Sequence, residues 1–176
     1  MCIDIINKAS FFNIREINVS EISFEPSLLE LCKMNSCGNY GRNYTCPPLV
    51  GDINNLTKQV KQYDKALVFQ KIYSLSDSFD IEGMENSRID FRELTHQLND
   101  ICKDGFDNYL LLTAGGCSEC RECAAVSGEP CRYPKKAYSS LEAYAINVSV
   151  LAEKCGFKYI NGKNTVTYFG AVFYKN

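Results

Sequence analysis

The sequence predicts a mixed α/β fold: a small mixed sheet with helices packed on it and two cysteine-rich metal loops. A compact β-branched and aromatic run at 65–73, a helical period over 85–104 and the short apolar run NYLLLT follow one another. The chain then closes with FKYINGKNTVTYFGAVFY, which has two strand-like runs around an Asn-Gly turn. Most of its 10 cysteines lie in two glycine-containing loops, which gives the fold its metal-type loops.

The first third of the chain carries the weaker secondary-structure signals. Apolar residues at 12, 14, 17 and 19 alternate imperfectly and predict a strand there. Pro26 suits a first helical turn, so a short helix is expected over 27–32. Asp52 can cap a helix, because the apolar residues after it recur at spacings of 3, 4 and 3: Ile53, Leu56, Val60 and Tyr63.

The middle of the chain predicts a β-α-β unit. A strand at 65–73, a helix over 85–104 and a strand at NYLLLT imply a parallel pair joined by a right-handed crossover. The glycines after the second strand then lie at its carboxyl end, where open α/β sheets collect ligands. Downstream, Ser139 and Glu142 fit a capping box for a helix that ends at Gly156. The closing segment predicts an antiparallel hairpin.

Length and composition bound the function classes. The 176 residues suit one domain, residues 1–176, with loop one at 32–51 and loop two at 115–134. A net charge of −2 without a Lys/Arg block argues against nucleic acid and against a charged membrane anchor. No secretory signal is visible and no apolar run approaches the roughly 20 residues of a membrane span, so we expect a cytoplasmic protein. In that compartment, cysteines favour metal ligation or redox chemistry over structural disulfides.

Loop two carries the strongest signal, Cys117-x2-Cys120-x2-Cys123-x7-Cys131. Three cysteines at two-residue gaps match the start of bacterial-type iron–sulfur sites, although the last gap exceeds the standard three residues. Zinc sites more often pair two distant C-x2-C knuckles, so a 4Fe-4S cluster is favoured and zinc is the alternative. Basic residues that could stand near the thiolates follow in the same region: Arg121, Arg132, Lys135 and Lys136.

Loop one carries Cys32-x4-Cys37-x8-Cys46, with Pro47 directly after the last cysteine. Proline after a ligating cysteine fixes the direction in which the chain leaves the site. Only three cysteines are present, so a cluster here needs a fourth ligand or keeps one iron open. The missing ligand could come from Cys2, Cys102, Cys155, His96 or a residue of a partner protein.

The other candidate residues have simpler interpretations. Cys155 lies on the apolar stripe of its helix and Cys102 flanks another stripe, so both are expected to be small core residues. His96 is the only histidine and shares a helix face with charged residues, so it is expected to be exposed and structural. Nothing in the sequence places it near a cysteine loop. No P-loop, nucleophile elbow or H-E-x-x-H motif is present.

Two segments together carry a resemblance to a known family: CGNYGRNYTCPP and GGCSECRECAAVSGEPCRYPKKAYSSLEAYAINV. The chain resembles the small prokaryotic proteins called predicted metal-binding proteins, a domain of unknown function. The resemblance runs from about Cys32 to the final strand and includes SFDIEGME and GKNTVTYFG. It implies metal ligation, of the iron–sulfur kind, and no particular reaction. The implied ligands are Cys32, Cys37 and Cys46 in loop one and Cys117, Cys120, Cys123 and Cys131 in loop two.

Three hypotheses of function remain open at the level of sequence. The first is an iron–sulfur protein, with one or two clusters, that acts as an electron carrier or redox accessory to a partner protein. The second is an enzyme whose loop-one centre keeps an open iron for a small substrate, with Tyr40, Arg42 or Tyr44 handling protons or anions. The third is a structural zinc module that binds another protein.

Overall fold

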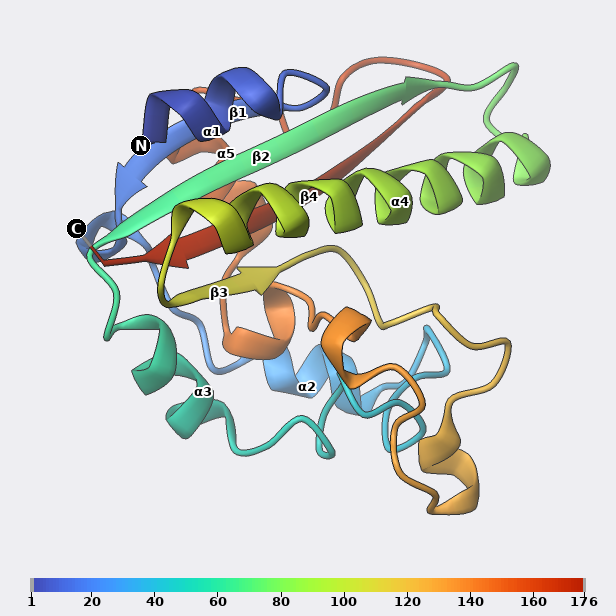
Figure 1. Cartoon of the computed structure of the whole chain (residues 1–176). Coiled ribbons are helices and arrows are strands. Elements are labelled where there is room, and N and C mark those ends of the chain that lie inside the picture. Colours follow the sequence, from blue (N-terminus) through green and yellow to red (C-terminus); the bar gives the residue numbers. More distant parts are fainter. Residues whose placement is uncertain (1, 176) are drawn as a thin grey trace.

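The structure is a computed structural model that describes residues 2–175 of the chain, with side chains from residue 4 onward. Its strands are β1 (Asn13–Asn18), β2 (Lys65–Ser74), β3 (Tyr109–Leu112) and β4 (Thr165–Tyr174). Its α-helices are α1 (Cys2–Lys8), α2 (Leu28–Lys33), α3 (Ile53–Val60), α4 (Ile81–Gly105) and α5 (Val148–Lys154). The predicted fold class, mixed α/β, is confirmed (Figure 1).

Among the described residues the strands form one sheet in the order β1-β2-β4-β3, with every neighbouring pair antiparallel. The helix α4 joins β2 to β3, as the sequence predicts. Because both strands run antiparallel to β4, they point the same way. The prediction of a directly paired parallel β-α-β unit is wrong, however, since β4 is inserted between the two strands. The unit is a split β-α-β arrangement.

The predicted C-terminal hairpin is also wrong. Residues before β4 form turns in place of a partner strand, and Gly162 and Asn164 have φ angles of 101° and 53°. The Asn161 amide donates to the Lys158 carbonyl and to the Thr167 hydroxyl, both at 2.9 Å, which holds this segment in a turn. The strand β4 pairs along its whole length with β2 instead.

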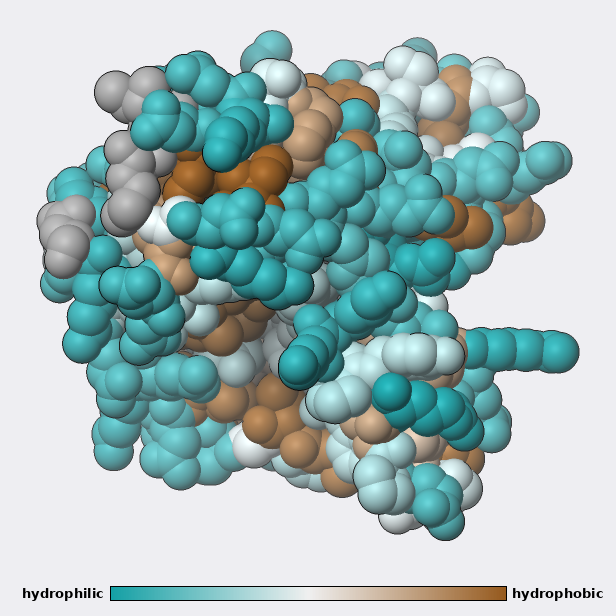
Figure 2. Space-filling model, viewed as in Figure 1, coloured by the Kyte–Doolittle hydropathy of each residue, from teal (hydrophilic) through white to brown (hydrophobic). Residues whose placement is uncertain are grey.

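Both faces of the sheet are buried under helices. Alternate residues of β2 divide between two core clusters: Ala66 and Val68 face one cluster, and Leu67 and Phe69 face the other. The first cluster includes residues of α3 and α5, and the second includes residues of α1 and α4. Figure 1 shows α4 crossing one face of the sheet, with α2 and α3 on the far side. Figure 2 shows that the outer face of α4 is largely hydrophilic, as expected of an amphipathic helix.

Among the remaining elements, the cap of α3 agrees with the predictions and two helices do not. Asp52 caps α3 by accepting hydrogen bonds from two backbone N–H groups, as predicted. The helix expected from Ser139 to Gly156 is instead split into a 3-10 turn, η4 (Glu142–Tyr144), and α5. Ala145 breaks the helix with a φ of 63°, and Asn147 caps α5. The short helix α1 was not predicted, because no capping residue or long apolar stripe marks it.

The segment 139–146 holds the beginnings of both cysteine loops together. Thr113, which ends the run of β3, donates from its N–H to the Ser139 carbonyl at 2.9 Å and accepts from the Leu141 N–H at 3.1 Å. A few residues later, the Ala145 carbonyl accepts from the Glu25 N–H, which precedes α2. Loop two therefore leaves and rejoins the scaffold at one point, with the approach to loop one beside it. Within the described part of the chain, no helix has the length and apolarity to cross a bilayer.

Candidate metal centre

The four cysteines of loop two line one small cavity, as their spacing predicts. The cavity is bounded by Cys117, Cys120, Cys123 and Cys131. All four side chains are partly exposed. Loop two has little regular structure, so the sulfurs are brought together by turns, and Gly115 and Gly128 adopt left-handed φ angles of 69° and 72°. This arrangement of soft sulfur donors around one space suits a thiophilic metal or an iron–sulfur cluster.

Hydrogen-bond donors face two of these sulfurs. A hydrogen bond from the Arg132 guanidinium to the Cys120 sulfur raises the pKa of that arginine. The same guanidinium donates to the Glu122 carbonyl at 3.0 Å, which fixes its position across the loop. Burial raises the pKa of Cys117, and a hydrogen bond from the backbone N–H of Glu119 lowers it. Donors and positive charge of this kind stabilise thiolates, the form in which cysteine binds metals.

The three cysteines of loop one lie within electrostatic reach of one another. Burial raises the pKa of the Cys46 thiol to about 11, against a lowering hydrogen bond from Thr45, and negative charge on Cys37, Cys32 and Cys117 raises it further. Cys46 is 8% exposed, whereas Cys37 is exposed. The buried sulfur of Cys46 thus stands between its own loop and Cys117 of loop two.

A closed ring of hydrogen bonds joins the loops at Cys117. The Cys117 N–H donates to the Thr45 hydroxyl at 2.9 Å, and that hydroxyl donates to the Asn43 side-chain oxygen at 3.0 Å. The Asn43 amide nitrogen closes the ring by donating to the Cys117 carbonyl at 2.8 Å. Next to it, a Cβ on Gly116 would lie 3.0 Å from the Cys46 sulfur, so this position has room only for glycine without a shift. The two loops therefore form one packed unit.

Two of the three polar residues expected to handle protons or anions beside loop one also tie the loops together. The Tyr44 hydroxyl donates to the Glu129 carbonyl at 2.7 Å, and Arg42 lies 4.0 Å from the Glu122 carboxylate. The Tyr40 backbone N–H donates to the Asn35 side chain within loop one. These contacts span the outside of the loop pair.

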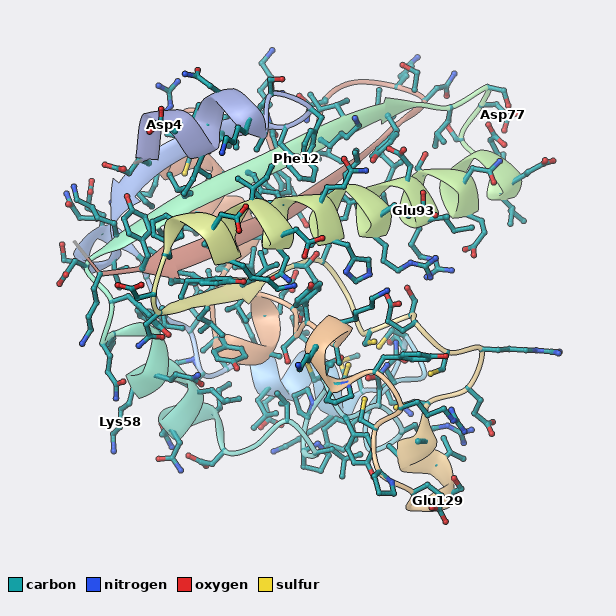
Figure 3. All side chains as sticks on the ribbon, viewed as in Figure 1. Asp4, Phe12, Lys58, Asp77, Glu93 and Glu129 are labelled. Carbon is teal, nitrogen blue, oxygen red and sulfur yellow. The ribbon has the colours of Figure 1, made fainter. Side chains whose placement is uncertain are left out.

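The thiols of the two loops are suitable metal ligands, but their side chains are not arranged as a coordination sphere. Figure 3 shows sulfur atoms gathered where the two loops meet. The nine cysteines whose side chains are described are free thiols. Within the part of the chain that the structure describes, no group of three Cys, His, Asp or Glu side chains is arranged to hold a metal ion. Ligation would therefore require thiols that share a cavity to rotate toward a common centre.

The structure separates the candidates for a fourth ligand of loop one. Cys102 and Cys155 are core residues, as predicted, at 0% and 3% exposure in opposite core clusters. Burial raises the pKa of Cys102 to about 12 and that of Cys155 to about 11, so both remain thiols at neutral pH. The side chain of Cys2 lies outside the described part of the chain.

The interpretation of His96 as an exposed residue, remote from the cysteine loops, is wrong. Its Nε2 lies 2.7 Å from the Glu119 carboxylate, between two cysteines of loop two, and its Nδ1 lies 3.2 Å from the Tyr138 hydroxyl. Arg92, one turn earlier on α4, donates to the Ser118 carbonyl at 2.8 Å. The helix therefore holds loop two through side chains that sequence spacing alone does not relate to it.

One half-buried carboxylate near loop one, that of Glu142, was not identified from the sequence as a site residue. Burial raises the pKa of Glu142, which begins η4, and the negative charge of Glu142 contributes to the raised pKa of Cys32. In the sequence, Glu142 was interpreted as part of a capping box with Ser139 and was therefore not considered as a ligand. Carboxylate oxygen is a harder donor than thiolate and is accepted by both zinc and iron.

The chain matches a protein-family model. The model described as "Predicted metal-binding protein (DUF2284)" matches residues 15–174. The chain belongs to that family. The match confirms the resemblance seen in the two cysteine segments and extends it back to β1, so the DUF2284 model covers the sheet as well as both loops. Membership in DUF2284 supports metal binding by this protein and gives no reaction. No curated protein and no solved structure matches the chain.

Proposed function

We propose that loop two of this protein binds a 4Fe-4S cluster through Cys117, Cys120, Cys123 and Cys131, and that the protein serves as an electron carrier or redox accessory. The observation that carries the proposal is that all four thiols line one cavity. Two consecutive two-residue gaps in the sequence support iron–sulfur ligation over zinc. The four sulfurs come from one loop, so a single segment supplies the whole ligand set.

The surrounding residues suit a site that holds charge. An iron–sulfur cluster, when bound, takes up and releases an electron at a potential set by its net charge and by hydrogen bonds to its sulfurs. The Arg132 guanidinium beside Cys120 offsets negative charge on the thiolates, and the Glu119 N–H donates to the Cys117 sulfur. Both groups are positioned by the loop itself, so they would not need to reorganise when the charge of the site changes.

A redox partner protein is part of this proposal. The four thiols of loop two are partly exposed, so a second protein can approach them without opening the fold. Tyr133, which follows the last of these cysteines and lines the same cavity, is 50% exposed. Tyrosine at such a position offers apolar contact area with a polar tip, a composition typical of protein interfaces.

Loop one is the candidate for a second centre. Cys32, Cys37 and Cys46 supply three thiols, and the electrostatic coupling of Cys46 to the other two supports their acting together. Of the candidate fourth ligands, Cys102 and Cys155 lie in the core and His96 bonds to loop two. Glu142 is the described carboxylate whose charge acts on Cys32. The number of iron atoms per chain distinguishes one centre from two.

A structural zinc clasp is the second candidate function, favoured by one observation. The ring of hydrogen bonds at Cys117 fuses loops that are remote in sequence, and a structural metal at the same place would contribute folding energy. Such a protein would be colourless and would not change its absorption on reduction. Its metal would be lost together with its fold.

The deciding experiment is anaerobic purification followed by iron, sulfide and zinc analysis, with an absorption spectrum before and after dithionite. We expect near-equal iron and sulfide and a visible band that bleaches on reduction; about eight irons would indicate two cubane clusters and about four would indicate one. Cys120→Ser should lose the loop-two centre. Cys155→Ala, which removes a thiol outside both loops, is the matched control and should retain the full iron content. Stoichiometric zinc without colour would refute the iron–sulfur proposal.

A further inference from the structure

We propose that the cavity between α4 and loop two binds a small organic anion that carries an aromatic ring. The cavity has a volume of about 670 Å³, within the range of small-molecule sites. It is bounded by the N-terminal half of α4, by the Gly115-Gly116 segment and by loop two. In Figure 2 a notch in the outline separates α4 from the loops in this region. Figure 3 shows α4 side chains that reach from the helix toward the loops.

The cavity shares a wall with the candidate metal centre. Cys117, Glu119 and Cys120 line both the large cavity and the small cavity enclosed by the four cysteines. A molecule in the large cavity would therefore lie against the same loop segment whose other side faces the thiols. Binding at this site goes beyond the proposed electron-carrier function, and it depends on no particular metal.

The charges around the cavity favour an anion. Its lining has four basic side chains, Arg88, Arg92, Arg121 and Lys136, against two acidic ones, Glu85 and Glu119.

The acidic groups are already engaged. The Nε of Arg88 donates to Glu85 at 2.8 Å, and Glu119 lies 2.7 Å from His96 and 3.6 Å from Arg92. Among the described residues, Arg121 and Lys136 have no ion-pair partner within 4.0 Å. The charge of Lys136 helps to lower the pKa of Asp100, which does not line the cavity, so a ligand carboxylate would supply a counter-charge inside it.

The rest of the lining favours a ring. Phe91 and Tyr168 lie side by side on the wall, with ring centroids 5.1 Å apart and planes inclined by 31°. Tyr138 also lines the cavity, and its hydroxyl lies 3.2 Å from His96. Phe91 is 4% exposed and supports Tyr168 from the core, so the two tyrosines supply the surface on which a flat ligand can pack with little loss of conformational entropy. The site thus combines two tyrosine rings with basic side chains that outnumber the acidic ones of the lining.

Isothermal titration calorimetry with the anaerobically purified protein tests the proposal, using benzoate, acetate and benzylammonium as probes. We expect benzoate to bind, acetate to bind at least about tenfold more weakly because it lacks the ring, and benzylammonium not to bind. Lys136→Gln should weaken benzoate binding about tenfold, the effect of losing one charge-assisted contact. Lys135→Gln is the matched control, since Lys135 is the neighbouring residue in η3 (Pro134–Lys136) and does not line the cavity.

Each unfavourable outcome overturns a defined part of the inference. Benzylammonium binding as well as benzoate would refute the anion site, and acetate binding as well as benzoate would refute the aromatic part. An equal loss in Lys135→Gln and Lys136→Gln would show general attraction to a basic surface in place of a site. Metal content is measured on the same samples, so failure of benzoate to bind to fully metal-loaded protein counts against the cavity alone. Absence of iron with intact benzoate binding counts against the cluster alone.

Discussion

Replacing Asn43 by alanine should uncouple the two cysteine loops. The Asn43 side chain is 3% exposed and makes three of the hydrogen bonds that join or shape the loops. Its amide nitrogen donates to the Cys117 carbonyl, and its oxygen accepts from the N–H and the hydroxyl of Thr45. Alanine can make none of these contacts.

The cost follows from the groups that lose their partners. The Cys117 carbonyl and the Thr45 N–H lose a hydrogen bond, and each such buried group costs about 1–3 kcal/mol. The Thr45 hydroxyl can rotate toward another acceptor and adds less. Water entering the vacated space satisfies part of the loss, so the free energy of unfolding should fall by about 2–4 kcal/mol. For a domain of this length that corresponds to a decrease in Tm of roughly 4–16 °C.

Thermal unfolding followed by far-UV circular dichroism, with metal content measured on the same anaerobic sample, provides the assay. Asn55→Ala is the matched control, because Asn55 is exposed on α3 and its substitution should change stability by no more than about 0.5 kcal/mol. The variant Asn43→Ala should also hold less metal than the wild type. A loss of stability below about 1 kcal/mol, with metal content unchanged, would refute the view that this ring joins the loops.

Three further predictions concern other parts of the molecule. Burial raises the pKa of the Cys102 thiol to about 12, so the stability that this thiol contributes is complete below pH 9 and declines as the pH rises. Between pH 9 and 11, the free energy of unfolding in urea should therefore fall more steeply for the wild type than for Cys102→Ala, by up to about 1.4 kcal/mol per pH unit. Gly170→Ala should lower the free energy of unfolding by about 1–3 kcal/mol in the same assay, because its Cβ would overlap the Phe69 ring and lie 2.8 Å from the Leu112 carbonyl. Wild-type stability would contradict the close packing of β2 and β3 around this position of β4. Arg132→Gln should lower the reduction potential of a loop-two cluster in a spectroelectrochemical titration, because it removes positive charge beside a ligating sulfur. Lys135→Gln should change the potential less. Equal shifts in the two variants would contradict a specific role for Arg132.

Local patterns predicted the elements of the fold better than their pairing. The capped helix α3, the long helix α4 and the strand β2 follow from periodicity and capping over neighbouring residues. The position of β4 between β2 and β3 depends on contacts across more than fifty residues, for which a single sequence has no local signal. The Asn-Gly pair before β4 resembles a hairpin turn in the sequence. In the structure, however, the Asn161 side chain donates to Lys158 and Thr167 and closes a loop.

The candidate site shows the same division. Cysteine spacing was enough to group the four thiols of loop two, because their convergence is set by short gaps along the chain. The contact of His96 with Glu119 was missed because it joins a helix to a loop and leaves no pattern in the sequence around either residue. The buried position of Cys46 against Gly116 likewise depends on how two loops pack.

The closure of loop two at Thr113 has a consequence for how this protein can change. The two ends of the loop are hydrogen-bonded to each other beside the sheet, through Thr113 at one end and Ser139 and Leu141 at the other. The positions of these ends therefore do not depend on the length of the chain between them. Insertions or exchanges within the excursion add only a slowly growing loop-closure entropy. Length can therefore change between these anchors at the positions that contact neither loop one nor α4, whereas Thr113 and the segment that receives it must keep their register. A transplanted loop would need this anchoring pair, together with the partners of Cys117 and Glu119, in its new host.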